Sequence, residues 1–341
     1  IFTQTIEMAK AAGMFSEENL HAIDSFMVWG ANARQDTYTM IYQGIKMVLE
    51  ILHFNDMDKE AWTVLKRTDY REKYRKPKID WEKEEEKKAL LDGLVKDALA
   101  LVEYVRAKET VPEDLKEATD LLERLVKQDT KINKDGKAEI IQGTAKDRIL
   151  SVNDVEMHHG RKTTSRCSDG YKAEILTGGE KAAIVMAVEV DGANTPDGEH
   201  MSDLIDEVKE TGNTVEKLYG DSAYSDWEEI EKREQEGIEF RTKTPQPVNK
   251  SGGYTKNEFD IDLESGTVTY PTGNVESFDT SKVENREGTV VKFCAEQCNS
   301  CPVREQCTKS RNGRSVNIHP YEDRIQQQRE FQKTAEFKED Y

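Results

Sequence analysis

Two short apolar runs, each of which carries an aspartate, constrain the fold of this chain more than any other feature. Residues 217–226, KLYGDSAYSD, bring Asp221 to the start of a turn that precedes a helical pattern. Residues 21–28, HAIDSFMV, hold Asp24 inside an otherwise strand-like run, where acidic residues are disfavoured unless they serve a purpose. Open α/β folds place metal ligands and catalytic groups at the carboxyl ends of strands. Both aspartates are therefore candidate metal ligands; the alternative is that they are plain strand-edge and turn residues.

The composition favours a soluble protein with more than one domain. A chain of 341 residues can bury a sizeable core. The net charge of -18 counts against a nucleic-acid binder, because a basic surface supplies most non-specific affinity for phosphate. Charge acts through patches, however, and an acidic average also suits a salt-rich cytoplasm. The sequence has no long apolar run and no signal-peptide pattern, so we expect a cytoplasmic protein that does not enter a membrane.

The first half of the chain is predicted to be mostly helical. Residues 3–14 have the pattern of a short helix ahead of the strand with Asp24. From about residue 36 to residue 131, apolar residues recur at three- and four-residue steps, which is typical of amphipathic helices. Pro112, followed by Glu113 and Asp114, fits the start of one of them. The charged run 82–88 fits a solvated helix face better than a binding tract. We expect a helical insertion over residues 34–147.

Beyond residue 149 the pattern changes to strands and helices in alternation. YKAEILTG and KAAIVMAVEVDG, joined through Gly178 and Gly179, predict a hairpin. Helices are expected at about 199–210 and 227–235, and strands just before Asp221 and at IEFRTKTP. The order strand, hairpin, helix, strand, helix, strand is that of a ribonuclease H-like mixed sheet. The expected fold class is therefore α/β (α+β), with residues 1–33 and 148–247 as its core.

Residues 248–318 are expected to form a compact β-rich insertion, because apolar runs are short and FDIDLESGTVTYPTG predicts a small hairpin. The insertion ends in four cysteines with the spacing C-x₃-C-x₂-C-x₅-C: Cys294, Cys298, Cys301 and Cys307. Short thiolate loops close tetrahedral zinc sites, so a structural Zn²⁺ is expected, with His319 as a replacement for one thiol. The alternative is a set of free thiols. Cys167 stands alone and is expected to be a buried or loop thiol. Residues 319–341 predict a polar helix.

The most basic window of this acidic chain is HHGRKTTSRCSDGYK. It supplies six candidate nucleic-acid contacts: His158, His159, Arg161, Lys162, Arg166 and Lys172. Arginine and lysine contact DNA phosphates and position the strand without reading its sequence, and the histidines could hydrogen-bond to phosphate. A solvated loop would have a similar composition, so both interpretations stay open.

Several separated motifs together resemble the DDE-class insertion-sequence transposases of bacteria and archaea. They are AIDSFMVWGANARQDTY, AKDRILSVNDVEMHHGRKTTSRCSDGYKAEI, GDSAYSD and the CxxCPxxxxC insertion followed by SVNIHPYE. The resemblance implies that Asp24 is the first catalytic aspartate and Asp221 the second, and that a Glu just past Tyr341 is the third carboxylate. The N-terminal helical DNA-binding region of such transposases is not matched ahead of the first strand. We therefore expect a central piece of a transposase.

The resemblance implies metal-dependent hydrolysis of a phosphodiester followed by strand transfer, with Mg²⁺ or Mn²⁺ held by Asp24 and Asp221. The expected partner is DNA, both as the terminal inverted repeats of the element and as the target; a homodimer is left open. The alternative function is a catalytically inactive remnant that acts as a zinc-stabilised nucleic-acid-binding module. The DNA just downstream of the codon for Tyr341 would separate the two, since an open frame encoding a helix with a Glu favours an active parent enzyme.

Overall fold

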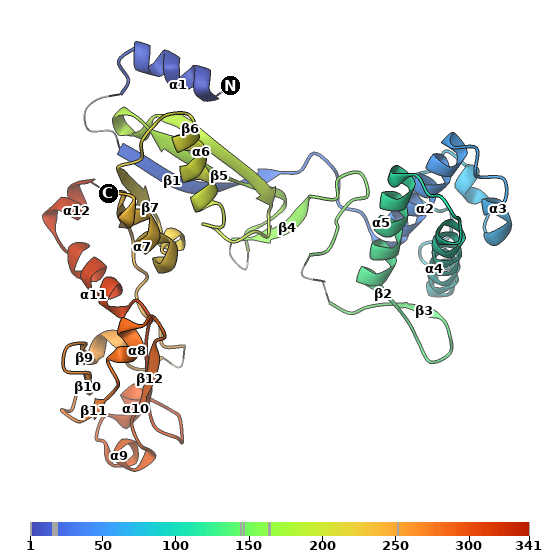
Figure 1. Cartoon of the computed structure of the whole chain (residues 1–341). Helices are drawn as coiled ribbons and strands as arrows, with labels where there is room; N and C mark the ends of the chain where they lie inside the picture. The colour runs from blue at the N-terminus through green and yellow to red at the C-terminus, as the bar shows by residue number, and fades with distance from the viewer. Residues whose placement is uncertain are drawn as a thin grey trace. The chain divides into compact units, whose positions relative to one another are not determined.

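The computed structural model describes residues 2–15, 20–143, 145, 147–162, 165–250 and 252–340, and it divides into two compact units (Figure 1). Unit 1 contains Ile1–Ser25, Glu174–Glu189 and Asp197–Tyr341, and unit 2 contains Phe26–Ala173 and Val190–Pro196. The strands β1 (Leu20–Trp29) and β5 (Cys167–Gly178) each continue from one unit into the other. None of the described helices is long and apolar enough to cross a lipid bilayer.

The largest sheet in the described residues has six strands in the order β4-β5-β1-β7-β8, with β6 paired to β5. The remaining strands are β4 (His158–Arg161), β6 (Ile184–Gly192), β7 (Lys217–Gly220) and β8 (Glu239–Thr242). β7 is parallel to both β1 and β8, whereas β4 is antiparallel to β5. β5 and β6 are joined through the short η2 (Glu180–Ala182) and pair with each other, as the predicted hairpin requires. The sheet is therefore mixed, and the predicted mixture of helices and sheet is confirmed.

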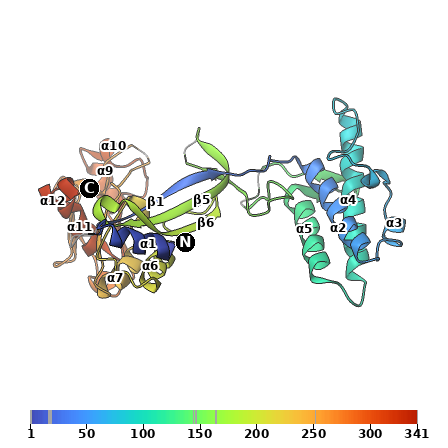
Figure 2. The same cartoon turned by 90° about the horizontal axis from the view of Figure 1, so that it is seen from above.

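The core of the sheet-bearing part of unit 1 includes three helices: α1 (Phe2–Ala11), α6 (Met201–Glu210) and α7 (Trp227–Gln235). Figure 2 shows α1 and α6 together with the strands β1, β5 and β6. Leu204, Ile205 and Val208 are fully buried on one face of α6, as amphipathic spacing predicts. Asp226 begins α7 by accepting hydrogen bonds from the backbone N–H groups of Glu228 and Glu229, which is the usual role of an aspartate at this position.

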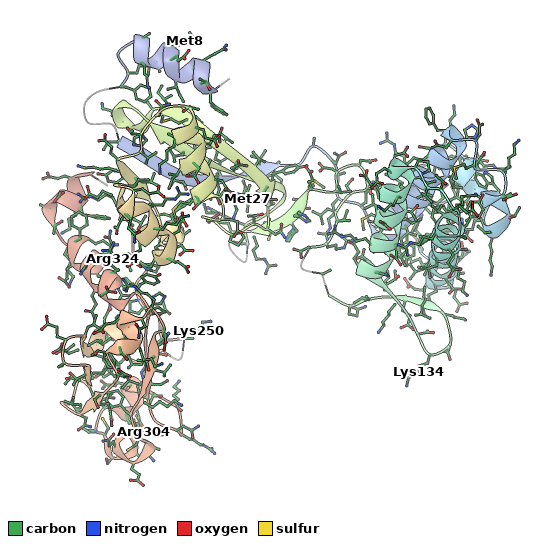
Figure 3. The ribbon with its side chains drawn as sticks, in the orientation of Figure 1. Met8, Met27, Lys134, Lys250, Arg304 and Arg324 are labelled. Carbon is green, nitrogen blue, oxygen red and sulfur yellow. The ribbon has the colours of Figure 1, made fainter. Side chains whose placement is uncertain are left out.

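Unit 2 contains the predicted helical segment. Its helices are α2 (Thr37–Phe54), α3 (Ala61–Val64), η1 (Asp69–Arg71), α4 (Glu84–Arg106) and α5 (Glu113–Asp129). They share one hydrophobic core, which includes the fully buried Ile45, Leu94 and Leu122. α5 begins directly after Pro112, as predicted. A small hairpin of β2 (Thr130–Ile132) and β3 (Ala138–Ile140) follows, with Lys134 at its tip (Figure 3).

A buried carboxylate ties the irregular segment between α3 and α4 to the helices. The side chain of Asp97 on α4 accepts hydrogen bonds from the backbone N–H groups of Lys66 and Arg67 and from the hydroxyl of Tyr70. Because a buried charge must be compensated by such bonds, these contacts fix the path of a segment that has little regular structure.

The segment after β8 forms a small β-rich part of unit 1. Its elements are η4 (Lys256–Glu258), β9 (Asp260–Asp262), β10 (Thr267–Thr269), β11 (Val275–Ser277), α8 (Ser281–Glu284), β12 (Thr289–Lys292), α9 (Ala295–Ser300), α10 (Arg304–Cys307) and β13 (Ser315–Ile318). β9 and β10 form the predicted hairpin, and β12 pairs with β13. The rings of Phe259, Tyr270 and Phe293 pack on one another with centroids 5.3 to 6.1 Å apart. This part therefore has a core of its own.

The predicted polar helix at the end of the chain is divided into α11 (Glu322–Phe331) and α12 (Ala335–Asp340). The hydroxyl of Thr334 accepts a hydrogen bond from the backbone N–H of Phe337, which satisfies a free donor in the first turn of α12. The rings of Phe331 and Phe337 meet edge to face at 5.5 Å. The break therefore comes from a threonine cap and an aromatic contact. Tyr341 lies outside the described residues.

Candidate functional site

The two predicted metal ligands lie at the same end of neighbouring parallel strands. In the pairing of β1 with β7, Ile23 lies opposite Gly220, and Asp24 and Asp221 are the next residue along each chain segment. Both aspartates are exposed. The pairing thus brings together two residues that are far apart in the sequence, at matched positions of the two strands.

Local hydrogen bonds hold both carboxylates. Asp24 accepts a hydrogen bond from the backbone N–H of Ser25 at 2.8 Å. Asp221 caps the single turn η3 (Ser222–Tyr224), where its side chain accepts from the backbone N–H of Ala223 at 2.7 Å. The Gly/Ser composition of GDSAYSD explains this turn, because Gly220 lets Ile23 and Tyr224 approach closely: a Cβ at that position would lie 3.1 Å from each of them.

Two further acidic residues lie beside this site and were not predicted as site residues. Glu174 on β5 is 1% exposed and accepts a hydrogen bond from the backbone N–H of Gly198 at 2.9 Å. Asp197, the residue before Gly198, accepts a hydrogen bond from the hydroxyl of Ser25 at 2.8 Å. Burial raises the pKa of Glu174, although the N–H donors that face it act in the opposite direction. The sequence does contain a signal for Glu174, since it is an acid inside the apolar run YKAEILTG.

Burial also raises the pKa of the Tyr224 hydroxyl, and the negative charge of Glu174 beside it adds to this effect. Asp197 and Asp24 contribute smaller shifts in the same direction. The buried Tyr224 is therefore close to the acidic residues at this end of the sheet, and it stays a neutral phenol at physiological pH.

Within the described residues, no three His, Cys, Asp or Glu side chains form a group that could hold a metal ion. Carboxylate oxygens are the ligands that Mg²⁺ prefers. The pair of Asp24 and Asp221 therefore fits a divalent cation in its chemistry but does not supply a complete set of protein ligands.

The basic window forms a β-hairpin, which the sequence did not predict. Arg161 at the end of β4 lies opposite Cys167 at the start of β5, and the backbone N–H of Lys162 donates to the carbonyl of Arg166 at 2.9 Å. Arg161, Lys162 and Arg166 are all exposed at the end of this hairpin. Three of the six candidate nucleic-acid contacts are therefore gathered at one tip.

The other three candidates are engaged within unit 2. His159 lies 2.6 Å from the carboxylate of Asp169, and the ammonium of Lys172 donates to the carbonyl oxygen of Thr195. His158 packs against Gly192, where an added Cβ would lie 2.3 Å from the imidazole ring. These three side chains therefore make contacts within the protein at the base of the hairpin.

None of the four clustered cysteines forms a disulfide in the described residues, and they differ in exposure. Cys298 and Cys307 are buried in the core of the β-rich part, whereas Cys294 is exposed and accepts from the N–H of Gln297. Burial raises the pKa of Cys307, and the neighbouring Cys298 and Cys301 add to that shift. These three sulfurs therefore lie near one another, but they do not form a metal-binding group in the described residues.

His319, the predicted replacement ligand, makes different contacts. Its Nδ1 accepts from the backbone N–H of Tyr321 at 3.0 Å, and its own backbone N–H donates to Glu322 at 3.0 Å. Burial lowers the pKa of His319. The imidazole thus binds the backbone of Tyr321, the residue that precedes α11.

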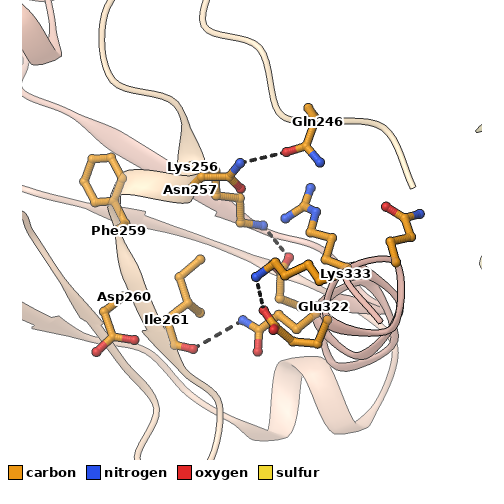
Figure 4. A pocket seen from close by; sticks show the side chains of 12 residues that line it. Gln246, Lys256, Asn257, Phe259, Asp260, Ile261, Glu322 and Lys333 are labelled. Atoms are coloured by element: carbon orange, nitrogen blue, oxygen red, sulfur yellow. Dashed lines mark hydrogen bonds and ion pairs between the residues drawn. The ribbon is translucent and has the colours of Figure 1, made fainter. Parts of the chain in front are cut away.

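A pocket of about 580 Å³ lies between η4, β9 and α11 (Figure 4). Lys256 pairs there with the buried Glu322, and Lys333 pairs with Glu330. Burial lowers the pKa of Lys256. Because most charges of this pocket are paired with each other, it presents no surface of one sign to an ionic ligand.

Comparison with known proteins supports the resemblance seen in the motifs. Residues 271–341 match the family model described as a transposase DDE domain. No curated protein and no solved structure matched the chain. The matched segment includes the cysteines and the helices α11 and α12, so the similarity to DDE-class transposases is confirmed for the last part of the chain.

Proposed function

We propose that this chain is a metal-dependent DNA transposase of the DDE class, with Asp24 and Asp221 as two of its metal ligands. The observation that carries the proposal is the pairing of β1 with β7, which gives the two aspartates matched positions at one end of the sheet. The match of residues 271–341 to a transposase DDE domain supports the same reaction. The strand order, with a hairpin on one side of β1 and two parallel strands on the other, supports a ribonuclease H-like core.

In this proposal the carboxylates bind and orient divalent cations. Asp24 and Asp221 would both hold these ions. When bound, Mg²⁺ or Mn²⁺ activates the attacking oxygen and stabilises the leaving oxygen of the phosphodiester. The hydrogen bonds from Ser25 and Ala223 hold the two carboxylates in place. The family resemblance assigns the third carboxylate to a Glu after Tyr341.

The partner in this proposal is DNA, bound through its phosphates. Arg161, Lys162 and Arg166 at the tip of the β4–β5 hairpin form the basic surface. Contacts of this kind position a nucleic acid without reading its sequence. Such a surface would let a chain whose average charge is acidic bind DNA.

A second candidate function is a nucleic-acid-binding module without catalysis, stabilised by its cysteine-rich part. The observation that favours it is the exposed Arg161, Lys162 and Arg166 at the end of the β4–β5 hairpin, since contacts of this kind to phosphate need no metal. The two functions differ in a measurable way, because only the first requires Asp24 and Asp221 to bind a metal.

The test combines Mn²⁺ binding with a cleavage assay on DNA that carries the ends of the parent element. Asp24→Asn and Asp221→Asn should each abolish Mn²⁺ binding, whereas the matched control Asp226→Asn should not, because asparagine also caps helices. DNA cleavage that both variants lose would support the catalytic function. Cleavage that Asp221→Asn abolishes would show that no further Glu is required, and Mn²⁺ binding unchanged in both variants would favour the binding module.

A further inference from the structure

Glu174 is a buried carboxyl group to which the proposed chemistry gives no role. It is 1% exposed, and its Oε1 accepts a hydrogen bond from the backbone N–H of Gly198 at 2.9 Å. The backbone N–H of His200 also hydrogen-bonds to this side chain. Burying an acid costs free energy that such bonds offset only in part. The position of these donors shows what Glu174 fixes, namely the loop just before α6.

This loop contacts the segment that bears Asp24. Asp197, directly before Gly198, accepts a hydrogen bond from the hydroxyl of Ser25 at 2.8 Å. The backbone N–H of Ser25 in turn donates to the Asp24 carboxylate at 2.8 Å. A shift of the loop therefore acts on Asp24 through one intervening residue.

The same loop contacts the turn that bears Asp221. Gly198 has a φ of 86°, and a Cβ built on it would lie 2.9 Å from the carbonyl oxygen of Ala223. The backbone N–H of Ala223 donates to the Asp221 carboxylate at 2.7 Å. The loop thus packs directly against the residue that holds Asp221 in place.

We propose that Glu174 is a positioning residue for Asp24 and Asp221, because it holds one loop that contacts a hydrogen-bond partner of each. The inference rests on the proposed metal-binding function of the pair. Glu174 does not touch the metal. Residues that hydrogen-bond directly to metal ligands change metal affinity by about 10- to 100-fold when they are replaced, and Glu174 acts through one further residue.

The first measurement is the affinity of the full chain for Mn²⁺ alone, by electron paramagnetic resonance. Glu174→Ala should weaken it by up to roughly tenfold, whereas Glu174→Gln, which still accepts a hydrogen bond from Gly198, should restore most of it. Glu322→Ala is the matched control, since Glu322 is also 1% exposed but bonds to other residues. Ser25→Ala removes the hydrogen bond of this side chain to Asp197 in the loop, and it should also weaken Mn²⁺ binding.

The second measurement is amide hydrogen exchange without metal. The N–H groups of Gly198 and Ala223 should exchange faster in Glu174→Ala than in Glu174→Gln or in Glu322→Ala. Mn²⁺ affinity that depends on Asp24 and Asp221 but is unchanged in Glu174→Ala would overturn the positioning role alone. Equal weakening in Glu174→Ala and Glu322→Ala would overturn it as well, because that result indicates general destabilisation. Mn²⁺ affinity independent of both aspartates would overturn the proposed function and the positioning role together.

Discussion

Gly198 and Gly212 share a backbone conformation but differ in their surroundings. Gly198 has a φ of 86° and Gly212 a φ of 76°, both in the left-handed region that favours glycine. A Cβ at Gly198 would lie 2.9 Å from the Ala223 carbonyl oxygen, whereas nothing lies within 4 Å of one at Gly212. The two positions therefore separate the effect of backbone strain from that of a steric clash.

We expect Gly212→Ala to lower the free energy of unfolding by about 1–2 kcal/mol, the cost of a left-handed conformation for an L-residue. Gly198→Ala should lower it further, because the loop before α6 must also move away from the turn after Asp221. Urea unfolding without metal ions measures both variants. Equal losses would show that the loop does not pack against this turn as described.

Asp24 and Glu174 give the same sequence signal, an acid in an apolar strand-like run, yet only Asp24 was predicted as a site residue. Asp24 is exposed, whereas Glu174 is 1% exposed. This difference depends on the loop that carries Gly198, which is distant from both in the sequence. The local pattern could therefore predict that these acids have a function but not which of them contacts solvent.

At the scale of elements, Arg106 links α4 to α5. Its guanidinium lies 2.9 Å from the carboxylate of Asp120 and 3.0 Å from that of Glu123. Hydrogen bonds from Arg106 and Lys127 lower the pKa of Glu123 from 4.5 to about 2. Ionised Glu123 is therefore favoured in the folded state.

Because the folded pKa lies below the unfolded value, Glu123 contributes stability above pH 4.5 that is lost as the pH falls towards 2. The difference in unfolding free energy between the wild type and Glu123→Gln should be constant at neutral pH and shrink across that window. Glu103→Gln, an equal change of charge on α4, serves as the control. If this difference in unfolding free energy instead grows on acidification, the ion pair between Arg106 and Glu123 is wrongly assigned. High salt should make the difference at neutral pH smaller, because it screens exposed charges.

The hairpin of β4 and β5 carries a second prediction at this scale. Replacing Arg161, Lys162 and Arg166 by glutamine should weaken DNA binding and lower the slope of log affinity against log salt by roughly 2 to 3. The matched control replaces three exposed lysines of the other hairpin in unit 2, Lys131, Lys134 and Lys137. Filter binding over a salt series measures both triple variants. If both triple variants weaken DNA binding equally, the loss comes from the change in net charge and not from a binding surface at the β4–β5 hairpin.

Most elements could be predicted from periodicity, and the exceptions have physical causes. β4 was missed because HHGR lacks an alternating pattern; it forms through its pairing with β5. The break between α11 and α12 was missed because neither Gly nor Pro marks it. A threonine cap and an aromatic contact produce it instead, and the contact joins side chains on two different helices.

At the scale of the molecule, the described residues contain separate hydrophobic cores. Leu94 belongs to the helical core of unit 2, and Leu204 belongs to the core around the sheet in unit 1. Both are fully buried. Cores that share no residue can unfold in separate steps, as is common in proteins of several domains.

We therefore expect at least two transitions in calorimetric unfolding. Leu94→Ala and Leu204→Ala should each destabilise their own unit by about 2–5 kcal/mol. Each variant should lower the midpoint of one transition and leave the other unchanged. A single transition that both variants shift equally would show that the two units unfold together.

Composition could not predict where the charge of the molecule lies. The net charge of -18 argued against nucleic acid, yet three cations gather at the tip of one hairpin. The pairing of β1 with β7, which brings Asp24 and Asp221 to matched positions, likewise depends on the strand order. The strand pattern and the family resemblance together predicted that order. The resemblance also implies a third carboxylate, which no local pattern in the sequence specifies.

The thiol of Cys167 offers a practical use of the β4–β5 pairing. It is exposed and lies opposite Arg161, whereas Cys298 and Cys307 are buried and should react slowly with alkylating reagents. In a Cys294→Ser background, a maleimide dye should label Cys167 first. The fluorophore would then be one strand away from the basic tip, so its emission would report the arrival of an oligonucleotide in real time.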